Sequence, residues 1–300
     1  MSSILILGSE GFIGNNLINH FEDISYQVTG CDLYETAMHG DYRYHKVSRL
    51  SPEWEEIIGS KEFTYCVNAA GSGNVPYSML HPVADFEANV LDTIRILDAI
   101  RRQNTACRYL HISSAAVYGN PLALPVKETA PTSPLSPYGF HKLMSEQICR
   151  EYHQVYGLSI AIIRPFSVYG EGLRKQLFWD ICSRLEDTDT IELFGTGKES
   201  RDFLHVRDLA VLIQKILVQS GFNCTVYNAG SGVETTLHRV ASLVEKYFKN
   251  EKQITFSGEA RKGDPINWKA DIDAIKSLGF TPSLKLEQGI VGYIKWFQSL

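Results

Sequence analysis

The stretch GSEGFIG at residues 8–14 constrains this chain more than any other feature. It follows an apolar run at residues 4–7 and opens an amphipathic run. A strand, a glycine-rich turn and a helix start, in that order, suit the binding of a nucleotide diphosphate. Gly8 permits a sharp turn out of the strand, Gly11 lets the backbone approach phosphates, and Gly14 lets the helix pack closely on the strand. A glycine triplet alone also fits a strand–helix turn without a ligand.

A second apolar stretch, residues 26–31, supports the nucleotide interpretation because it ends in Asp32. A carboxylate at the end of the second strand accepts hydrogen bonds from the hydroxyls of an adenosine ribose and repels a 2′-phosphate. The sequence therefore predicts NAD as the cofactor in preference to NADP.

Composition narrows the class of protein. The 300 residues suit one or two domains, and 44% hydrophobic with 21% charged residues is typical of a soluble globular protein. A net charge of −5 argues against nucleic acid or an anionic membrane as the partner. The six cysteines are scattered, which indicates reduced thiols in a cytoplasmic protein and no zinc site. We expect no signal peptide before the first strand and no membrane span.

The first half of the chain alternates strand-like and helix-like segments, which predicts an α/β fold with a parallel sheet covered on both faces. The predicted strands are residues 4–7, 26–31, 42–47, 64–69, 108–113 and 159–164. The predicted helices are residues 15–21, 52–58, 82–103 and 138–156. In the helix at 52–58, we expect Ser51 as the N-cap and Pro52 as the first residue.

The second half is less regular. It contains predicted helices at 174–185, 205–219, 235–248, 271–278 and 286–297, and predicted strands at 191–194 and 225–228. We expect a dinucleotide-binding domain over residues 1–165, to which residues 205–229 return. Residues 166–204 and 230–300 would form a smaller lobe that closes over the substrate.

Small residues follow the predicted strand at 64–69. Ala69, Ala70 and Gly71 would let the backbone lie against a cofactor, or would simply pack tightly. Asn89 lies inside the long predicted helix at 82–103, where an asparagine faces water roughly as often as it serves a site.

Three polar residues form a second constellation. Ser114 follows the fifth strand, at the edge where open parallel sheets bind ligands. Tyr138 and Lys142 are four residues apart at the start of a helix, so they share a face. An ammonium group and the positive nicotinamide ring would favour the phenolate, which could take a proton from a hydroxyl while Ser114 orients it. Each residue alone has a structural explanation, so their order along the chain carries the argument.

The chain resembles, over nearly its whole length, the extended short-chain dehydrogenase/reductases that act on nucleotide sugars. The motifs in family order are Gly8-x-x-Gly11-x-x-Gly14, Asp32, Asn68-Ala69-Ala70, Val75-x-x-Ser78, Asn89, Ser113-Ser114-Ala115-Ala116-Val117-Tyr118-Gly119, Pro137-Tyr138-x-x-x-Lys142, Arg164-Pro165-Phe166, Val168-Tyr169-Gly170, Gly195-Thr196-Gly197, Arg201-Asp202-Phe203, Val206-Arg207-Asp208 and Arg261-x-Gly263-Asp264.

The resemblance implies a Rossmann-type doubly wound parallel sheet with a smaller mixed α/β C-terminal substrate lobe. It implies that Ser114, Tyr138 and Lys142 are catalytic. The residues assigned to NAD are Gly8, Gly11, Phe12, Ile13, Gly14, Asp32, Ala69, Ala70, Gly71, Asn89, Tyr138, Lys142 and Pro165. The residues assigned to a nucleotide-diphosphate sugar are Ser78, Ser114, Ser167, Arg201 and Arg261, the two arginines serving the diphosphate. Members commonly form homodimers through a four-helix bundle, here from residues 82–103 and 136–156.

Three functions remain open. Ala115 and Ala116 stand where related dehydratases and decarboxylases carry acidic residues, which disfavours both of those reactions. The first hypothesis is a nucleotide-sugar 4-epimerase that retains its NAD. The second is a 4-keto-6-deoxy-sugar reductase with exchangeable NAD(P)H, favoured by the short chain and by Ser167, where epimerases usually carry asparagine. The third, a non-catalytic dinucleotide-binding regulator, is disfavoured because Tyr138 and Lys142 are both present.

Overall fold

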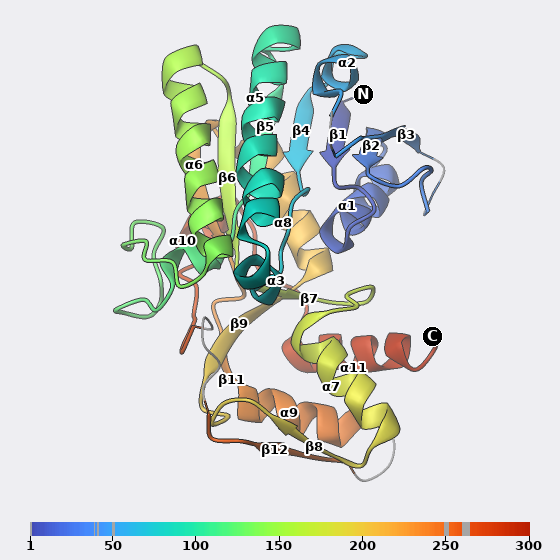
Figure 1. Ribbon diagram of the computed structural model, residues 1–300, viewed down its shortest axis with the longest axis vertical. Coiled ribbons are helices and arrows are strands. Elements are labelled where there is room, and N and C mark those ends of the chain that lie inside the picture. The colour runs from blue at the N-terminus through green and yellow to red at the C-terminus, as the bar shows by residue number, and fades with distance from the viewer. Residues whose placement is uncertain (1, 39, 41, 50–51, 249–251, 260–264) are drawn as a thin grey trace.

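A seven-stranded parallel sheet forms the centre of the protein in a computed structural model that describes residues 2–38, 40, 42–49, 52–248, 252–259 and 265–300 (Figure 1). The strand order is β10-β6-β5-β4-β1-β2-β3, and every neighbouring pair is parallel. The strands are β1 (Ser3–Leu7), β2 (Gln27–Asp32), β3 (Arg43–Lys46), β4 (Tyr65–Asn68), β5 (Arg108–Ile112), β6 (Ile160–Pro165) and β10 (Asn223–Ala229).

Helices cover both faces of this sheet. On one face lie α2 (Trp54–Gly59), α5 (Asp92–Gln103) and α6 (Pro137–Tyr156), and on the other α1 (Phe12–Asp23), α8 (Val206–Gln219) and α10 (Asp273–Ser277). Along β1, Ile4 and Ile6 pack toward α1 and α8, whereas Leu5 and Leu7 pack toward α2, α5 and α6. Strands buried on both faces read as continuous apolar runs, as residues 4–7 do. The predicted doubly wound α/β fold is confirmed.

Two smaller sheets lie beside the main one. One has the order β11-β9-β7 and the other pairs β12 with β8. Their strands are β7 (Ser167–Tyr169), β8 (Thr190–Leu193), β9 (Ser200–His205), β11 (Glu234–Thr236) and β12 (Gln253–Phe256). Helices α7 (Gln176–Asp187), α9 (Leu237–Tyr247) and α11 (Leu286–Phe297) share a separate apolar core with them, in the lower part of Figure 1.

The order of the strands reverses at β1. The chain proceeds from β1 to β2 and β3 on one side, and from β4 through β5 and β6 to β10 on the other. Open α/β sheets bind ligands at the carboxyl ends of the strands next to such a reversal. Gly8 follows β1 at that edge and Ala69 follows β4, so the predicted cofactor segments lie next to each other. The return of residues 225–228 to the main sheet, as β10 beside β6, is also confirmed.

The predicted start of the helix at 52–58 is wrong. Helix α2 begins at Trp54, with Glu53 as its N-cap, and Pro52 precedes it. The reason is burial, because Trp54, Ile57 and Ile58 fill one side of the core with helical spacing that begins at Trp54. Ser51, the predicted cap, lies outside the described residues.

The long predicted helix at 82–103 is interrupted. It consists of α4 (Pro82–Phe86), a π-helical turn η1 (Glu87–Leu91) and α5, and a short helix α3 (Val75–Leu80) that was not predicted precedes it. Asn89 lies in the π-helical turn and is buried, so the water-facing interpretation of this residue is wrong. Turns of this kind are frequent at functional sites.

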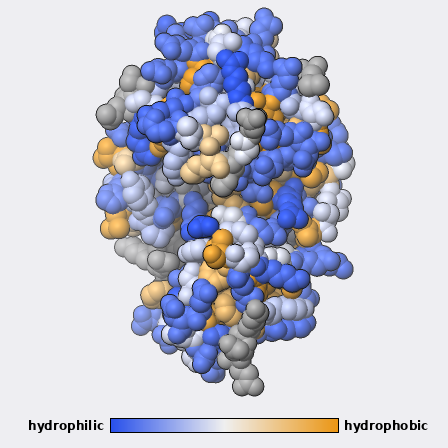
Figure 2. All heavy atoms as spheres, turned by 90° about the vertical axis from the view of Figure 1, so that its right-hand side faces the viewer, coloured by the Kyte–Doolittle hydropathy of each residue, from blue (hydrophilic) through white to orange (hydrophobic). Residues whose placement is uncertain are grey.

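None of the helices within the described residues combines the length and the apolar character needed to cross a membrane. On the side of the molecule shown in Figure 2, hydrophobic residues occur in small groups among hydrophilic ones.

Candidate functional site

The glycine turn after β1 is packed so closely against other backbone atoms that side chains do not fit there. Gly8 has a φ of +75°, and a Cβ there would lie 2.7 Å from the backbone of Ala70. A Cβ on Gly14 would overlap the carbonyl oxygen of Gly8. Gly11 is the N-cap of α1, and no side chain caps this helix, so its first N–H groups face the turn. These features fit the diphosphate of a dinucleotide.

The residues that follow the turn also pack the protein. Phe12 opens α1 and packs against the lower apolar core, whereas Ile13 packs against the core of the main sheet. Asp32 ends β2, where its Oδ2 accepts a hydrogen bond of 2.9 Å from the Glu10 N–H and its Oδ1 accepts one of 2.7 Å from the Leu33 N–H. The carboxylate therefore lies beside the glycine turn, as predicted from its position in the sequence.

Sequence reasoning missed Tyr42 at this edge. Its hydroxyl donates to the Glu10 carboxylate and lies 3.0 Å from Ser9 Oγ, so the segment just before β3 supports the glycine turn. The sequence feature that relates to this contact is the glycine at position 30, inside a strand. A Cβ there would lie 2.5 Å from the Tyr42 ring, so the ring can pack at this place only against a glycine.

The loop after β4 completes the cofactor side. Ala69 donates its N–H to the Leu7 carbonyl at 3.0 Å, and Ala70 lies against Gly8. Gly71 has a φ of +111°, and a Cβ there would lie 2.6 Å from Asn89 Oδ1. Asn89 Nδ2 donates to the Ser72 carbonyl at 3.3 Å. Asn89 therefore holds this loop in place beside the glycine turn.

Ser114, Tyr138 and Lys142 come together at the ends of β5 and α6. Ser114 caps the short 3-10 helix η2 (Ala115–Tyr118) and lies near the Tyr138 phenol, whose pKa it lowers. Ser136 caps α6, which starts at Pro137 and thereby fixes the first turn. Lys142 Nζ is buried and donates to the Ile112 carbonyl at 2.9 Å. The predicted catalytic residues thus share one place in the fold.

Burial controls the protonation of this pair. The pKa of Tyr138 is raised to about 12, mainly by burial and to a smaller extent by the Asp85 charge, while the neighbouring Ser114 lowers it. Burial lowers the pKa of Lys142 to about 8, against the opposing effect of Asp85. The protein's own groups therefore keep the phenol protonated at neutral pH, and the expected ionisation by Lys142 stays a prediction.

Ser78 supports the start of α6. Its hydroxyl is fully buried, donates to the Val75 carbonyl at 2.7 Å and accepts from the Tyr138 N–H at 3.1 Å. It links α3 to the first turn of α6. Its assignment to the substrate stays a prediction.

A buried ion pair that sequence reasoning missed lies behind the catalytic residues. Glu146, on α6, accepts hydrogen bonds from Arg164 Nε at 2.8 Å and Nη2 at 2.6 Å. It also accepts one of 2.6 Å from the Ser113 hydroxyl. Both charged residues are almost fully buried, so the pair ties β5 and β6 to α6. Arg164 was noted only as part of a motif.

The remaining predicted residues lie at the end of β6 and beyond it. Pro165, assigned to NAD, is the buried last residue of β6, and the half-buried Ser167, assigned to the substrate, begins β7. In β9, Arg201 donates to the carbonyls of Ser200 and Ile266, and its guanidinium lies 5.7 Å from the Trp268 ring. Arg261, the second predicted diphosphate ligand, lies outside the described residues.

The Trp268 contact connects Arg201 with the loop that follows η2. The Trp268 indole donates to the Gly119 carbonyl at 3.0 Å, directly after η2, and its ring packs edge-to-face on Phe166. A chain of packed residues therefore connects β9 with the segment that begins at Ser114.

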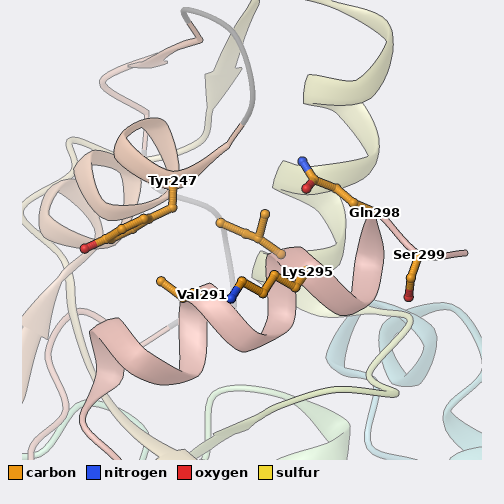
Figure 3. A pocket seen from close by; sticks show the side chains of 6 residues that line it. Tyr247, Val291, Lys295, Gln298 and Ser299 are labelled. Atoms are coloured by element: carbon orange, nitrogen blue, oxygen red, sulfur yellow. The ribbon is translucent and has the colours of Figure 1, made fainter.

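A pocket elsewhere contains none of these residues. It lies on helices α9 and α11 and is lined by Tyr247, Val291, Ile294, Lys295, Gln298 and Ser299 (Figure 3).

Comparison with known proteins agrees with this geometry. The family described as "NAD dependent epimerase/dehydratase family" matches residues 4–230. The "Putative UDP-glucose 4-epimerase" of Methanocaldococcus jannaschii is 30% identical over 310 residues, covering 99% of this chain and 98% of the relative. The "UDP-glucose 4-epimerase" of Azospirillum brasilense is 28% identical over 328 residues, with 99% and 92% covered.

Among solved structures, "MoeE5 in complex with UDP-glucose and NAD" superimposes with a TM-score of 0.90 at 26% identity and covers 99% of both chains. These similarities extend over the sheet, the glycine turn and the smaller lobe. The chain belongs to the NAD-dependent epimerase/dehydratase family, whose cofactor is NAD.

Proposed function

We propose that the protein is an NAD-dependent 4-epimerase of a UDP-hexose. The observation that carries the proposal is the meeting of Ser114, Tyr138 and Lys142 at the edge of the sheet that also holds the glycine turn. The relatives named UDP-glucose 4-epimerases, and the structure named as a complex with UDP-glucose and NAD, support the choice of substrate class.

Each polar residue has a distinct part in the proposed reaction. NAD, when bound, supplies a hydride acceptor for the sugar C4 and a positive charge on its ring. Tyr138 takes the proton of the C4 hydroxyl and later returns it, and Ser114 orients that hydroxyl. Lys142 holds a positive charge behind the phenol. Arg201, with Arg261, anchors the diphosphate while the sugar turns its other face.

The test is whether the purified protein converts a UDP-hexose into its C4 epimer without net oxidation or reduction of the nicotinamide cofactor. Incubation with UDP-glucose, UDP-galactose and their N-acetyl and uronic acid forms should interconvert one C4 pair, with no net change in reduced-nicotinamide absorbance. Stoichiometric loss of NADH or NADPH with a 4-keto sugar, and no epimer, would show the reductase instead. The reductase is tested as well because Ser167, half-buried at the start of β7, stands where epimerases usually carry asparagine.

We further propose that residues 1–165 and 205–229 form the NAD-binding domain, and that residues 166–204 and 230–300 form the nucleotide-sugar lobe, from which α10 reaches back to pack on the main sheet. The separate apolar core around α7, α9 and α11 supports this division. The six cysteines are all free thiols, which supports a cytoplasmic location.

We propose a homodimer through the face formed by α4, α5 and α6. The last two helices lie side by side in front of the sheet in Figure 1. Large hydrophobic side chains are exposed along this face at Val83, Phe86, Ile94, Phe140 and Met144. Exposed apolar side chains on neighbouring helices suit a second copy of the same face, and pairing of α5 and α6 with their counterparts would give a four-helix bundle. Phe140→Glu should yield a monomer in light scattering, whereas Val218→Glu on the exposed side of α8 should not.

A further inference from the structure

A buried carboxylate that the proposed reaction does not use lies behind the start of α6. Asp85, in α4, is fully buried, and its Oδ2 accepts a hydrogen bond of 2.6 Å from His141 Nδ1. Its Oδ1 is also buried and has no hydrogen-bond partner among the described residues. A buried carboxylate with one unpartnered oxygen is costly, so joining α4 to α6 is an insufficient reason for its presence.

The position of this carboxylate is fixed relative to the catalytic pair. His141 directly precedes Lys142 and follows Tyr138 by one helical turn. The Phe86 ring packs edge-to-face on the imidazole with 5.5 Å between the ring centres, which fixes its orientation. The Asp85 charge raises the pKa of both Tyr138 and Lys142. It therefore favours the protonated form of each group.

Other titratable groups near this part of α6 have a smaller effect than Asp85 on the protonation of Tyr138 and Lys142. Besides His141 itself, those on α6 and the elements packed against it include His81, Glu87, Asp92, His111, Tyr118, Glu146, Cys149 and Cys224, and Asp92 is paired with Arg95. His81 and Glu87 are exposed, so solvent screens them. Burial raises the pKa of the tyrosine and both thiols, and burial lowers that of His111, which keeps all four neutral. The ion pair with Arg164 neutralises Glu146.

We propose that Asp85 is a positioning residue for the acid/base pair, whose carboxylate, held by His141, keeps Lys142 in the ammonium form and favours transfer of the sugar hydroxyl proton to the Tyr138 oxygen. The inference rests on the proposed function, because it concerns the step in which Tyr138 takes the proton of the C4 hydroxyl.

The first test is the pH profile of kcat/KM for the UDP-hexose. Asp85→Asn keeps the shape of the side chain and removes the charge, so both limbs should move to lower pH by about 0.5–1 unit. Glu151→Gln removes an exposed charge elsewhere on α6 and is the matched control. This control should not move the profile.

The second test does not depend on turnover. The absorbance of tyrosinate in the NAD-bound protein, with and without the substitution Tyr138→Phe, isolates the titration of this one phenol. In the Asp85→Asn background the phenol should ionise at lower pH. If Asp85→Asn alone does not fold, the double variant with His141→Asn supplies a complementary amide pair and the same loss of the carboxylate charge.

The outcomes separate the two proposals. A lower melting temperature with unmoved profile and unmoved phenol titration would overturn the inference and leave Asp85 as a structural link. A shifted phenol titration without conversion of any UDP-hexose would support the inference and overturn the proposed substrate.

Discussion

The glycine turn after β1 and the first turn of α6 serve the same edge of the sheet but are built in opposite ways. The glycine turn is defined by missing side chains, since Gly8 and Gly14 have no room for a Cβ. The start of α6 is defined by buried polar side chains, with Lys142, Glu146 and Asp85 all below the surface. The comparison teaches that backbone sterics shape the proposed cofactor site, whereas side-chain contacts between distant segments hold the proposed catalytic residues in place.

Removing the phenol gives the largest expected effect. Tyr138→Phe should lower turnover by about 10³-fold or more, because the group that moves the C4 proton is lost. NAD affinity, measured by calorimetry, should stay within a few-fold of the unmodified protein, since the glycine turn is untouched. Retained turnover in this variant would remove Tyr138 as the acid/base and would break the distinction between the two regions.

Breaking the buried ion pair between Glu146 and Arg164 tests whether side-chain contacts hold α6 against the sheet. Glu146→Gln should lower the free energy of unfolding by about 3 kcal/mol, because Arg164 is left buried without its counter-charge. Urea unfolding measures this change. Lys246→Gln, which breaks an exposed pair with Glu287, should cost far less. Equal costs for the two variants would contradict the buried role of Glu146.

A matched pair of glycine substitutions tests whether the close backbone packing of the glycine turn is needed for NAD binding. Gly8→Ala and Gly157→Ala both place alanine at a positive φ, +75° and +71°, but only Gly8 faces other backbone atoms at close range. We expect Gly157→Ala to cost about 1 kcal/mol of stability and to bind NAD normally. Gly8→Ala should cost more than that and lose NAD binding. Similar NAD affinity in both proteins would show that the space beside Ala70 does not matter.

A smaller, pH-dependent effect on the stability of the fold is expected at Glu171, which follows β7. The buried His205 imidazole and Arg207 lie beside Glu171 and lower its pKa to about 2. Because the folded-state pKa is depressed, this interaction stabilises the fold above pH 4.5, the ordinary value, and is lost as the pH falls toward 2.

Glu171→Gln should therefore lower stability by about 1 kcal/mol at pH 6, a value reduced because the side chain is partly exposed to solvent. The difference from the unmodified protein should narrow as the pH is lowered from 6 to 3.5 in thermal unfolding experiments. A constant difference across this range would mean that the carboxylate charge is not what stabilises the contact.

Local patterns in the chain settled much of the architecture. The apolar run at 4–7, the glycine spacing and Asp32 follow from short-range rules of strand burial, backbone sterics and strand-end position, and the fold confirms that placement. The helix at 286–297 was also predicted with the bounds the structure has. Such features depend on neighbours within a few residues, so the sequence by itself determines them.

Contacts between distant segments were decided only by the tertiary structure. Glu146 with Arg164, Asp85 with His141, and Tyr42 with Glu10 each join segments 18 to 56 residues apart, and no local period marks them. The π-helical turn at Asn89 has the same origin, because the amide reaches the loop after β4. Whether a polar side chain meets a buried partner or water depends on which elements pack together, and that information is spread over the whole chain.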